Sequence, residues 1–182
     1  ISDELQNNNI KTYKYKDQVI FEEKEILTQN KNPYTIFTPY KNNHLKKIFN
    51  EGITQYDCDS YKVNLAKFKN RSLQSLKEIG FEKSNISSMN LPLGTQGGIA
   101  LIEDFKKRIK NYSHNRNFPG TKGVSYLSVH NRFGTVSIRH LAKIALDDNS
   151  EGSTIWLNEL IWRDFYFQIL SNFPHIQAGE AF

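Results

Sequence analysis

The chain has 182 residues, of which 38% are hydrophobic and 13% aromatic, so the composition excludes an intrinsically disordered protein. The formal net charge of +5 favours polyanionic partners. No apolar run approaches the roughly 18 residues that a membrane span needs. The single cysteine, Cys58, excludes an internal disulfide and a cysteine-based metal site, and fits a reducing, cytosolic compartment.

The first half of the chain predicts two short strands, one helix and a connector. Residues 18–21 and 34–37 are short apolar runs of strand type, each next to turn signals. Thr38 and Pro39 suit the N-cap and the first position of a helix that continues to about residue 49. Residues 50–98 are polar and end in a turn-rich stretch, which is typical of a long connector.

The second half predicts helices. Apolar spacing indicates one helix from about residue 99 to 112, broken at 118–120, and another over 137–146. Residues 147–152 read as a polar loop, after which Ser153 or Thr154 can cap a third helix. Because the chain begins without methionine and stops just after a helical pattern, we expect an internal fragment of a longer protein.

The third helix carries two distinct faces. One is apolar, made by Leu157, Leu160, Ile161, Phe165 and Ile169. The other places Glu159, Trp162, Arg163 and Tyr166 at offsets 0, 3, 4 and 7. A carboxylate, an indole, a guanidinium and a phenol on one face can stack on flat rings, bind phosphate and hydrogen-bond a base edge. An ordinary surface ion pair between Glu159 and Arg163 is the simpler interpretation, but it leaves the tryptophans unexplained.

Two further stretches indicate anion and nucleic-acid binding. Residues 103–143 hold nine Lys/Arg against two acids, with aromatic residues between them; a solvated basic face is the alternative. Gly123, Ser125 and Ser128 form a small hydroxyl-rich loop that can bind phosphate, although a plain serine-rich turn has the same composition. No metal site is expected. Four histidines are spaced wrongly, both from one another and from acidic residues, to be ligands of a metal ion: His114, His130, His140 and His175.

Three stretches of the sequence resemble a known protein family. Residues 156–166 closely resemble the Trp-x-x-Glu-Leu-Ile-Trp-Arg-Glu/Asp-Phe-Tyr segment of DNA photolyases and cryptochromes. Residues 123–134 resemble that family's Gly-Thr-Ser-x-Leu-Ser…Arg-Phe-Gly loop, with Val124 in place of the usual Thr. Residues 34–45 resemble its Pro-Tyr-x-x-Phe-Thr-Pro-Phe/Tyr pattern.

The resemblance implies a role for each site residue. Glu159 and Trp162 would serve catalysis, Glu159 by hydrogen-bonding a flipped-out pyrimidine dimer and Trp162 as a flat wall for it. DNA would also be contacted by Arg116, Arg163 and Tyr166. The FAD cofactor would be held by Tyr112, Val124, Ser125, Tyr126, Leu127, Ser128, Trp156 and Arg163.

The implied protein is an α+β fragment of a photolyase. Residues 1–49 would be the remnant of an α/β, Rossmann-like antenna domain, 50–98 the interdomain linker, and 99–182 the first part of an all-helical FAD- and DNA-binding domain. The parent would be a cytosolic monomer that repairs cyclobutane pyrimidine dimers with light and reduced FAD, with a folate or deazaflavin antenna. The fragment alone would bind FAD weakly and repair nothing.

Three other functions stay open at this point. A cryptochrome-type photosensor has the same fold and cofactor with a signalling output. Repair of pyrimidine–pyrimidone (6–4) lesions is less well supported, since its His-containing pattern is not visible. A non-catalytic helical nucleic-acid-binding module is supported only by the basic span, and salt-dependent DNA binding without flavin would distinguish it.

Overall fold

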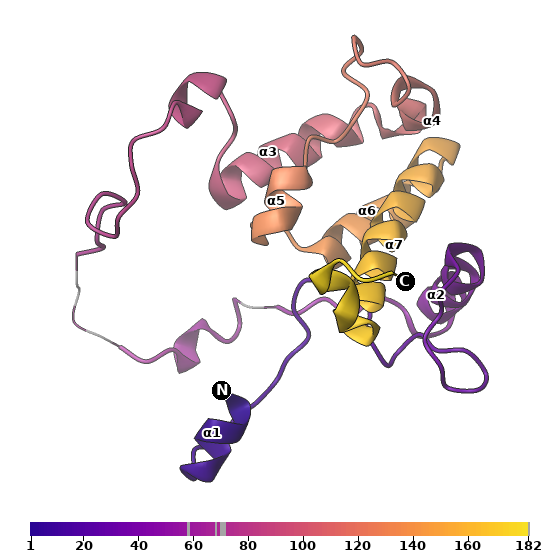
Figure 1. Ribbon diagram of the computed structural model, residues 1–182. Helices are drawn as coiled ribbons and strands as arrows, with labels where there is room; N and C mark the ends of the chain where they lie inside the picture. Colours follow the sequence, from indigo (N-terminus) through magenta and orange to yellow (C-terminus); the bar gives the residue numbers. More distant parts are fainter. Residues whose placement is uncertain (58, 68, 70–71, 182) are drawn as a thin grey trace.

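The chain is mostly helical in the computed structural model, which describes residues 1–57, 59–67, 69 and 72–181 (Figure 1); Cys58 lies outside these ranges. The α-helices are α1 (Ser2–Asn7), α2 (Phe37–Glu51), α3 (Gly94–Lys106), α4 (Tyr112–Asn115), α5 (Ser128–Phe133), α6 (Ile138–Asp148) and α7 (Glu151–Asn172). Four short 3₁₀ turns accompany them: η1 (Lys62–Asn64), η2 (Ile86–Met89), η3 (Ile109–Asn111) and η4 (Pro174–Ala178).

Helix α7 is the centre of the fold and confirms the helix expected from the motif. It contacts α2, α4, α6 and η3, and its apolar face is buried at Leu157, Leu160, Ile161 and Phe165. The expected cap was wrong, because Ser150 rather than Ser153 or Thr154 caps α7: its hydroxyl accepts the N–H of Ser153 at 3.2 Å. The predicted polar loop over 147–152 is therefore shorter, since α6 continues to Asp148 and α7 begins at Glu151.

Gly152 lets the first turn of α7 approach the backbone of η3 closely. A Cβ placed on it would lie under 3.0 Å from backbone atoms of Ile109 and Lys110. Backbone atoms cannot move aside as a flexible side chain can, so this contact requires glycine.

We expect Gly152→Ala to lower the free energy of unfolding by about 1–3 kcal/mol, because the added methyl overpacks the α7–η3 contact. Urea unfolding followed by circular dichroism measures the change. Gly120→Ala is the matched control, since a Cβ there meets nothing within 4 Å and its stability should stay within about 0.5 kcal/mol of the original. Equal stabilities of the two variants would contradict the packing argument.

The two predicted strands are wrong. Residues 18–21 and 34–37 are not strands, and no strand is present in the described part of the chain. A strand needs a neighbour to pair with, and the N–H groups of Ile20 and Phe21 donate instead to the side chain of Asp164. The expected α+β class is therefore not found, because the described part of the chain has helices and no strand. The division into three domains stays a prediction.

Two helix boundaries also differ from the prediction. Helix α2 begins at Phe37 with Ile36 as its N-cap, so Thr38 is helical rather than the cap. The helix expected over 99–112 begins earlier, as α3 from Gly94, so its first turn lies inside the predicted connector; it ends at Lys106 and is followed by the separate turn η3, where Ile109 is buried. The described residues of the connector before α3 form a long excursion away from the helices, and η1 and η2 are the only regular elements among them (Figure 1).

Candidate functional site

The second face of α7 borders an open hollow of about 380 Å³. The described side chains that line it all belong to α7: Glu159, Trp162, Arg163, Tyr166, Phe167 and Leu170. The four residues predicted from their spacing therefore do share one surface. Its size and aromatic lining suit a flat ring system.

Glu159 does not pair with Arg163, as the simple surface interpretation required. It forms an ion pair with Arg116, which follows α4, with 2.6 Å between Oε1 and Nη1. This hydrogen bond raises the pKa of the Arg116 guanidinium, which also lies 5.3 Å from the ring centroid of Tyr112. The structure thus brings Glu159 together with Arg116 and Tyr112, which lie more than 40 residues earlier in the sequence.

Arg163 turns away from Glu159 toward the N-terminal segment. Its guanidinium donates to the carbonyl oxygens of Gln18 at 2.5 Å and Asn131 at 3.3 Å, and lies 4.6 Å from the ring centroid of Phe167. Burial lowers the pKa of Arg163, and the charge of Asp164 opposes this shift. Arg163 therefore joins three segments, and its predicted contacts with cofactor and DNA stay predictions.

The two tryptophans of α7 lie in different environments. Trp162 is half-buried beside the hollow and stacks on Phe37, with the ring centroids 3.5 Å apart and the planes 9° apart. Trp156 is only 4% exposed and packs edge-on against Phe105 at 4.8 Å. In this structure Trp156 belongs to the core, and its predicted place in a flavin pocket stays a prediction.

Tyr112 begins α4 and is buried against Phe105, with perpendicular rings 5.8 Å apart. Burial raises the pKa of the Tyr112 phenol, the nearby charge of Arg116 lowers it, and that of Glu159 raises it. The phenol is therefore a neutral hydrogen-bond donor near pH 7.

The predicted phosphate loop lies over residues 123–128 and is held by Arg108. The Nη1 of Arg108 donates to the carbonyl oxygens of Lys122 at 3.0 Å and Val124 at 2.7 Å, while Nη2 donates to Asp104. Its Nε is buried without a hydrogen-bond partner among the described residues. Sequence reasoning counted Arg108 only as one of nine basic residues, and no local pattern marks it as the support of this loop.

The loop itself alternates buried and exposed side chains. Leu127 is buried, whereas Val124 and Tyr126 are exposed. Tyr126 has a φ of 58°, which is unusual for a residue with a side chain and points to a constrained loop. Ser125 accepts the N–H of Leu127 at 3.4 Å, and Ser128 is the first residue of α5.

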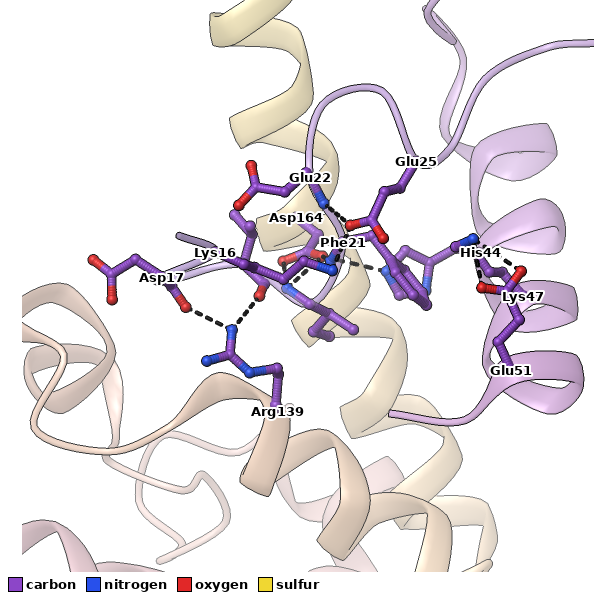
Figure 2. Close-up of polar contacts among 12 residues, drawn as sticks. Lys16, Asp17, Phe21, Glu22, Glu25, His44, Lys47, Glu51, Arg139 and Asp164 are labelled. Carbon is purple, nitrogen blue, oxygen red and sulfur yellow. Dashed lines mark hydrogen bonds and ion pairs between the residues drawn. The ribbon is translucent and has the colours of Figure 1, made fainter. Parts of the chain in front are cut away.

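Asp164 is a central residue that sequence reasoning missed. Its carboxylate is fully buried, accepts the N–H groups of Ile20 (2.9 Å) and Phe21 (3.1 Å), and lies 3.3 Å from Nε2 of His44 (Figure 2). In the sequence, the indication of this role was an acidic residue between Arg163 and Phe165, at a helix position that faces the core. It connects α7 with α2 and with the segment that precedes α2.

The described part of the chain contains neither a metal cluster nor a membrane-spanning helix. Among the residues that the structure describes, no group of three or more His, Cys, Asp or Glu side chains could hold a metal ion. None of the described helices is long and apolar enough to cross a membrane.

Comparison with known proteins relates this arrangement to one kind of enzyme. No protein-family model matches the chain. The deoxyribodipyrimidine photo-lyase of Escherichia coli is 27% identical over 179 residues, which cover 92% of this chain and 36% of that protein. The chain is homologous to part of the deoxyribodipyrimidine photo-lyases. The resemblance inferred from the motifs is thereby confirmed.

Other photolyases agree. That of Synechococcus is 26% identical over 189 residues (96% of this chain, 39% of that protein), and that of Neurospora crassa is 34% identical over 110 residues (56% and 18%). A crystal structure of a class III photolyase from Agrobacterium tumefaciens superimposes with a TM-score of 0.74 at 19% identity, over 95% of this chain and 37% of that one, which shows the shared fold. The chain spans little more than a third of the first two photolyases named.

Proposed function

We propose that this chain is part of a light-driven DNA-repair lyase that splits cyclobutane pyrimidine dimers with reduced FAD. The observation that carries the proposal is the aromatic hollow on α7, in which Glu159 and Trp162 lie side by side, in a chain homologous to deoxyribodipyrimidine photo-lyases. A flipped-out pyrimidine dimer needs a flat surface and a hydrogen-bond partner for its base edge. Trp162 and Glu159 supply these two features from one helix.

The surroundings of the hollow suit a DNA strand. Arg116 would have to leave its ion pair with Glu159 to contact a phosphate, while Tyr166 is exposed beside Trp162. The basic span between residues 103 and 143 adds attraction for the backbone, which depends on salt concentration. Arg163 would contact DNA only after giving up a carbonyl partner.

The residues predicted to hold FAD fit an anionic cofactor with a flat ring. The unpartnered, buried Nε of Arg108 lies in the side chain that supports the 123–128 loop, where the cofactor's diphosphate is expected. Ser125 and Ser128 offer hydroxyl groups, and Tyr112 a neutral phenol. Val124, Tyr126, Leu127, Trp156 and Arg163 complete the proposed contacts.

The chemistry that a reduced FAD held by these residues would supply under blue light is reversible one-electron transfer to the dimer. The chain's own task is binding, orientation and charge stabilisation. Glu159, released from Arg116, would hydrogen-bond the edge of the flipped-out base and so orient the dimer. Trp162 would exclude water from one side of the dimer and keep its plane fixed.

The proposal includes the rest of the protein. We propose a cytosolic monomer with a folate or deazaflavin antenna, in which residues 1–49 end the preceding domain, 50–98 form the interdomain linker and 99–182 begin the helical FAD domain. A cryptochrome-type photosensor is the second candidate. It is favoured by one observation: Glu159 is engaged internally by Arg116, in an ion pair that a photosensor need not undo.

Damage-selective DNA binding separates these functions. We expect the protein to bind an oligonucleotide with one thymine dimer at least tenfold more tightly than the undamaged strand, in fluorescence anisotropy at fixed salt. Equal affinities with bound flavin would favour the photosensor. Equal, salt-dependent affinities without flavin would favour the plain nucleic-acid-binding module.

A further inference from the structure

We propose that Phe37 is a positioning residue for Trp162: it stacks on one face of the indole and so holds the ring as a fixed wall of the hollow. The inference rests on the proposed function in that the wall would receive a pyrimidine base. The contact itself is a parallel stack, with centroids 3.5 Å apart and planes inclined by 9°. Phe37 belongs to α2, far from the α7 motif in the sequence.

Phe37 lies outside the hollow that Trp162 lines. The described lining residues of the hollow are all on α7, and Phe37 is not among them. Phe37 therefore supports the indole from behind instead of filling the space in front of it. A tryptophan at the edge of an open hollow has several rotamers available, and contact with a second ring reduces this freedom.

The position of Phe37 is itself well fixed. Phe165 packs edge-on against both rings, 5.8 Å from Phe37 and 5.8 Å from Trp162. One turn further along α2, Tyr40 is 1% exposed and lies 5.1 Å from the Phe165 ring. Since α2 is docked on α7 through Tyr40 and Phe165, its first residue can orient Trp162 without touching the substrate.

A pair of substitutions separates positioning from packing. Phe37→Leu keeps an apolar side chain but removes the flat ring, whereas Phe37→Tyr keeps the ring. Tyr34→Leu is the matched control, because Tyr34 is also half-buried and packs on Tyr40 at 6.1 Å, with no recorded ring contact to Trp162. Urea unfolding of each variant shows that it folds before its other properties are compared.

The first readout is the indole itself, without DNA. In the 182-residue chain, which has two tryptophans, Trp156→Phe leaves Trp162 as the only indole fluorophore. We expect Phe37→Leu to increase acrylamide quenching of Trp162 about twofold, and Phe37→Tyr and Tyr34→Leu to leave it unchanged. Unchanged quenching in Phe37→Leu would overturn the proposal, whatever the protein's function is.

The second readout is selective binding by the protein with both native tryptophans. We expect Phe37→Leu to raise the Kd for thymine-dimer DNA about fivefold, with the Kd for undamaged DNA changed less than about twofold, and Phe37→Tyr to restore the original selectivity. Tighter dimer binding by Phe37→Leu would overturn the proposal, since it would mean that Phe37 covers the surface that the base needs. If the unsubstituted protein showed no preference for dimer DNA, the proposed function would be overturned. The quenching result alone would then decide whether Phe37 positions Trp162.

Discussion

Asp164→Ala is expected to lower the free energy of unfolding by about 3 kcal/mol or more, because it removes the shared acceptor of a buried polar cluster. The backbone N–H groups of Ile20 and Phe21 and the ring of His44 all face this carboxylate, and Asp164 and His44 are fully buried. Without it, these donors stay buried with no acceptor, and the segment before α2 loses one of its polar attachments to α7 (Figure 2).

Urea unfolding followed by circular dichroism measures this loss. Asp164→Asn keeps the shape and one acceptor oxygen, so its loss should be about half as large. Asp147→Ala is the matched control, an Asp-to-Ala change at an exposed position of α6, which should change stability by less than about 0.5 kcal/mol. If Asp164→Ala were no less stable than Asp147→Ala, the central role given to this carboxylate would be wrong.

Glu159→Ala is expected to weaken binding of thymine-dimer DNA about tenfold and to lower the yield of light-driven repair by a similar factor, because one hydrogen bond to the lesion is lost. Folding should hardly change. The Arg116–Glu159 pair is 32% and 39% exposed at its two side chains, and such pairs contribute about 0–1 kcal/mol.

Two variants sharpen this test. Glu159→Gln can still donate a hydrogen bond to a base edge, so it should retain more of the repair yield than Glu159→Ala. Glu151→Ala removes an exposed acid from the first turn of the same helix, outside the hollow, and should bind dimer DNA as the original does. Full repair by Glu159→Ala would contradict the role proposed for this carboxyl group.

The sequence predicted those parts of the fold that depend on local pattern. The period of Leu157, Leu160, Ile161 and Phe165 predicts α7 and its buried face, and both are found. The spacing of Glu159, Trp162 and Tyr166 predicts a shared surface, and these residues do line one hollow. Local spacing fixes which side chains share a helix face, so such statements need no knowledge of the tertiary structure.

The failures arise where tertiary contacts decide. Residues 18–21 have strand composition but no strand beside them, and the carboxylate of Asp164 accepts their N–H groups instead. Glu159 has Arg163 one turn away, yet pairs with Arg116, which follows α4 and is 43 residues away in the sequence. The stack of Phe37 on Trp162 joins segments whose proximity no local pattern contains. Local propensity is a weak guide wherever a distant group competes for the same partner.

The most direct test of the central claim is repair itself. The full-length protein that contains this chain, loaded with reduced FAD, is mixed with an oligonucleotide that contains one thymine dimer and is illuminated with blue light, with dark and oxidised-flavin samples as controls. The account predicts restored thymines only in the illuminated, reduced sample. Flavin-loaded protein that leaves the dimer intact under light would contradict the proposed repair function.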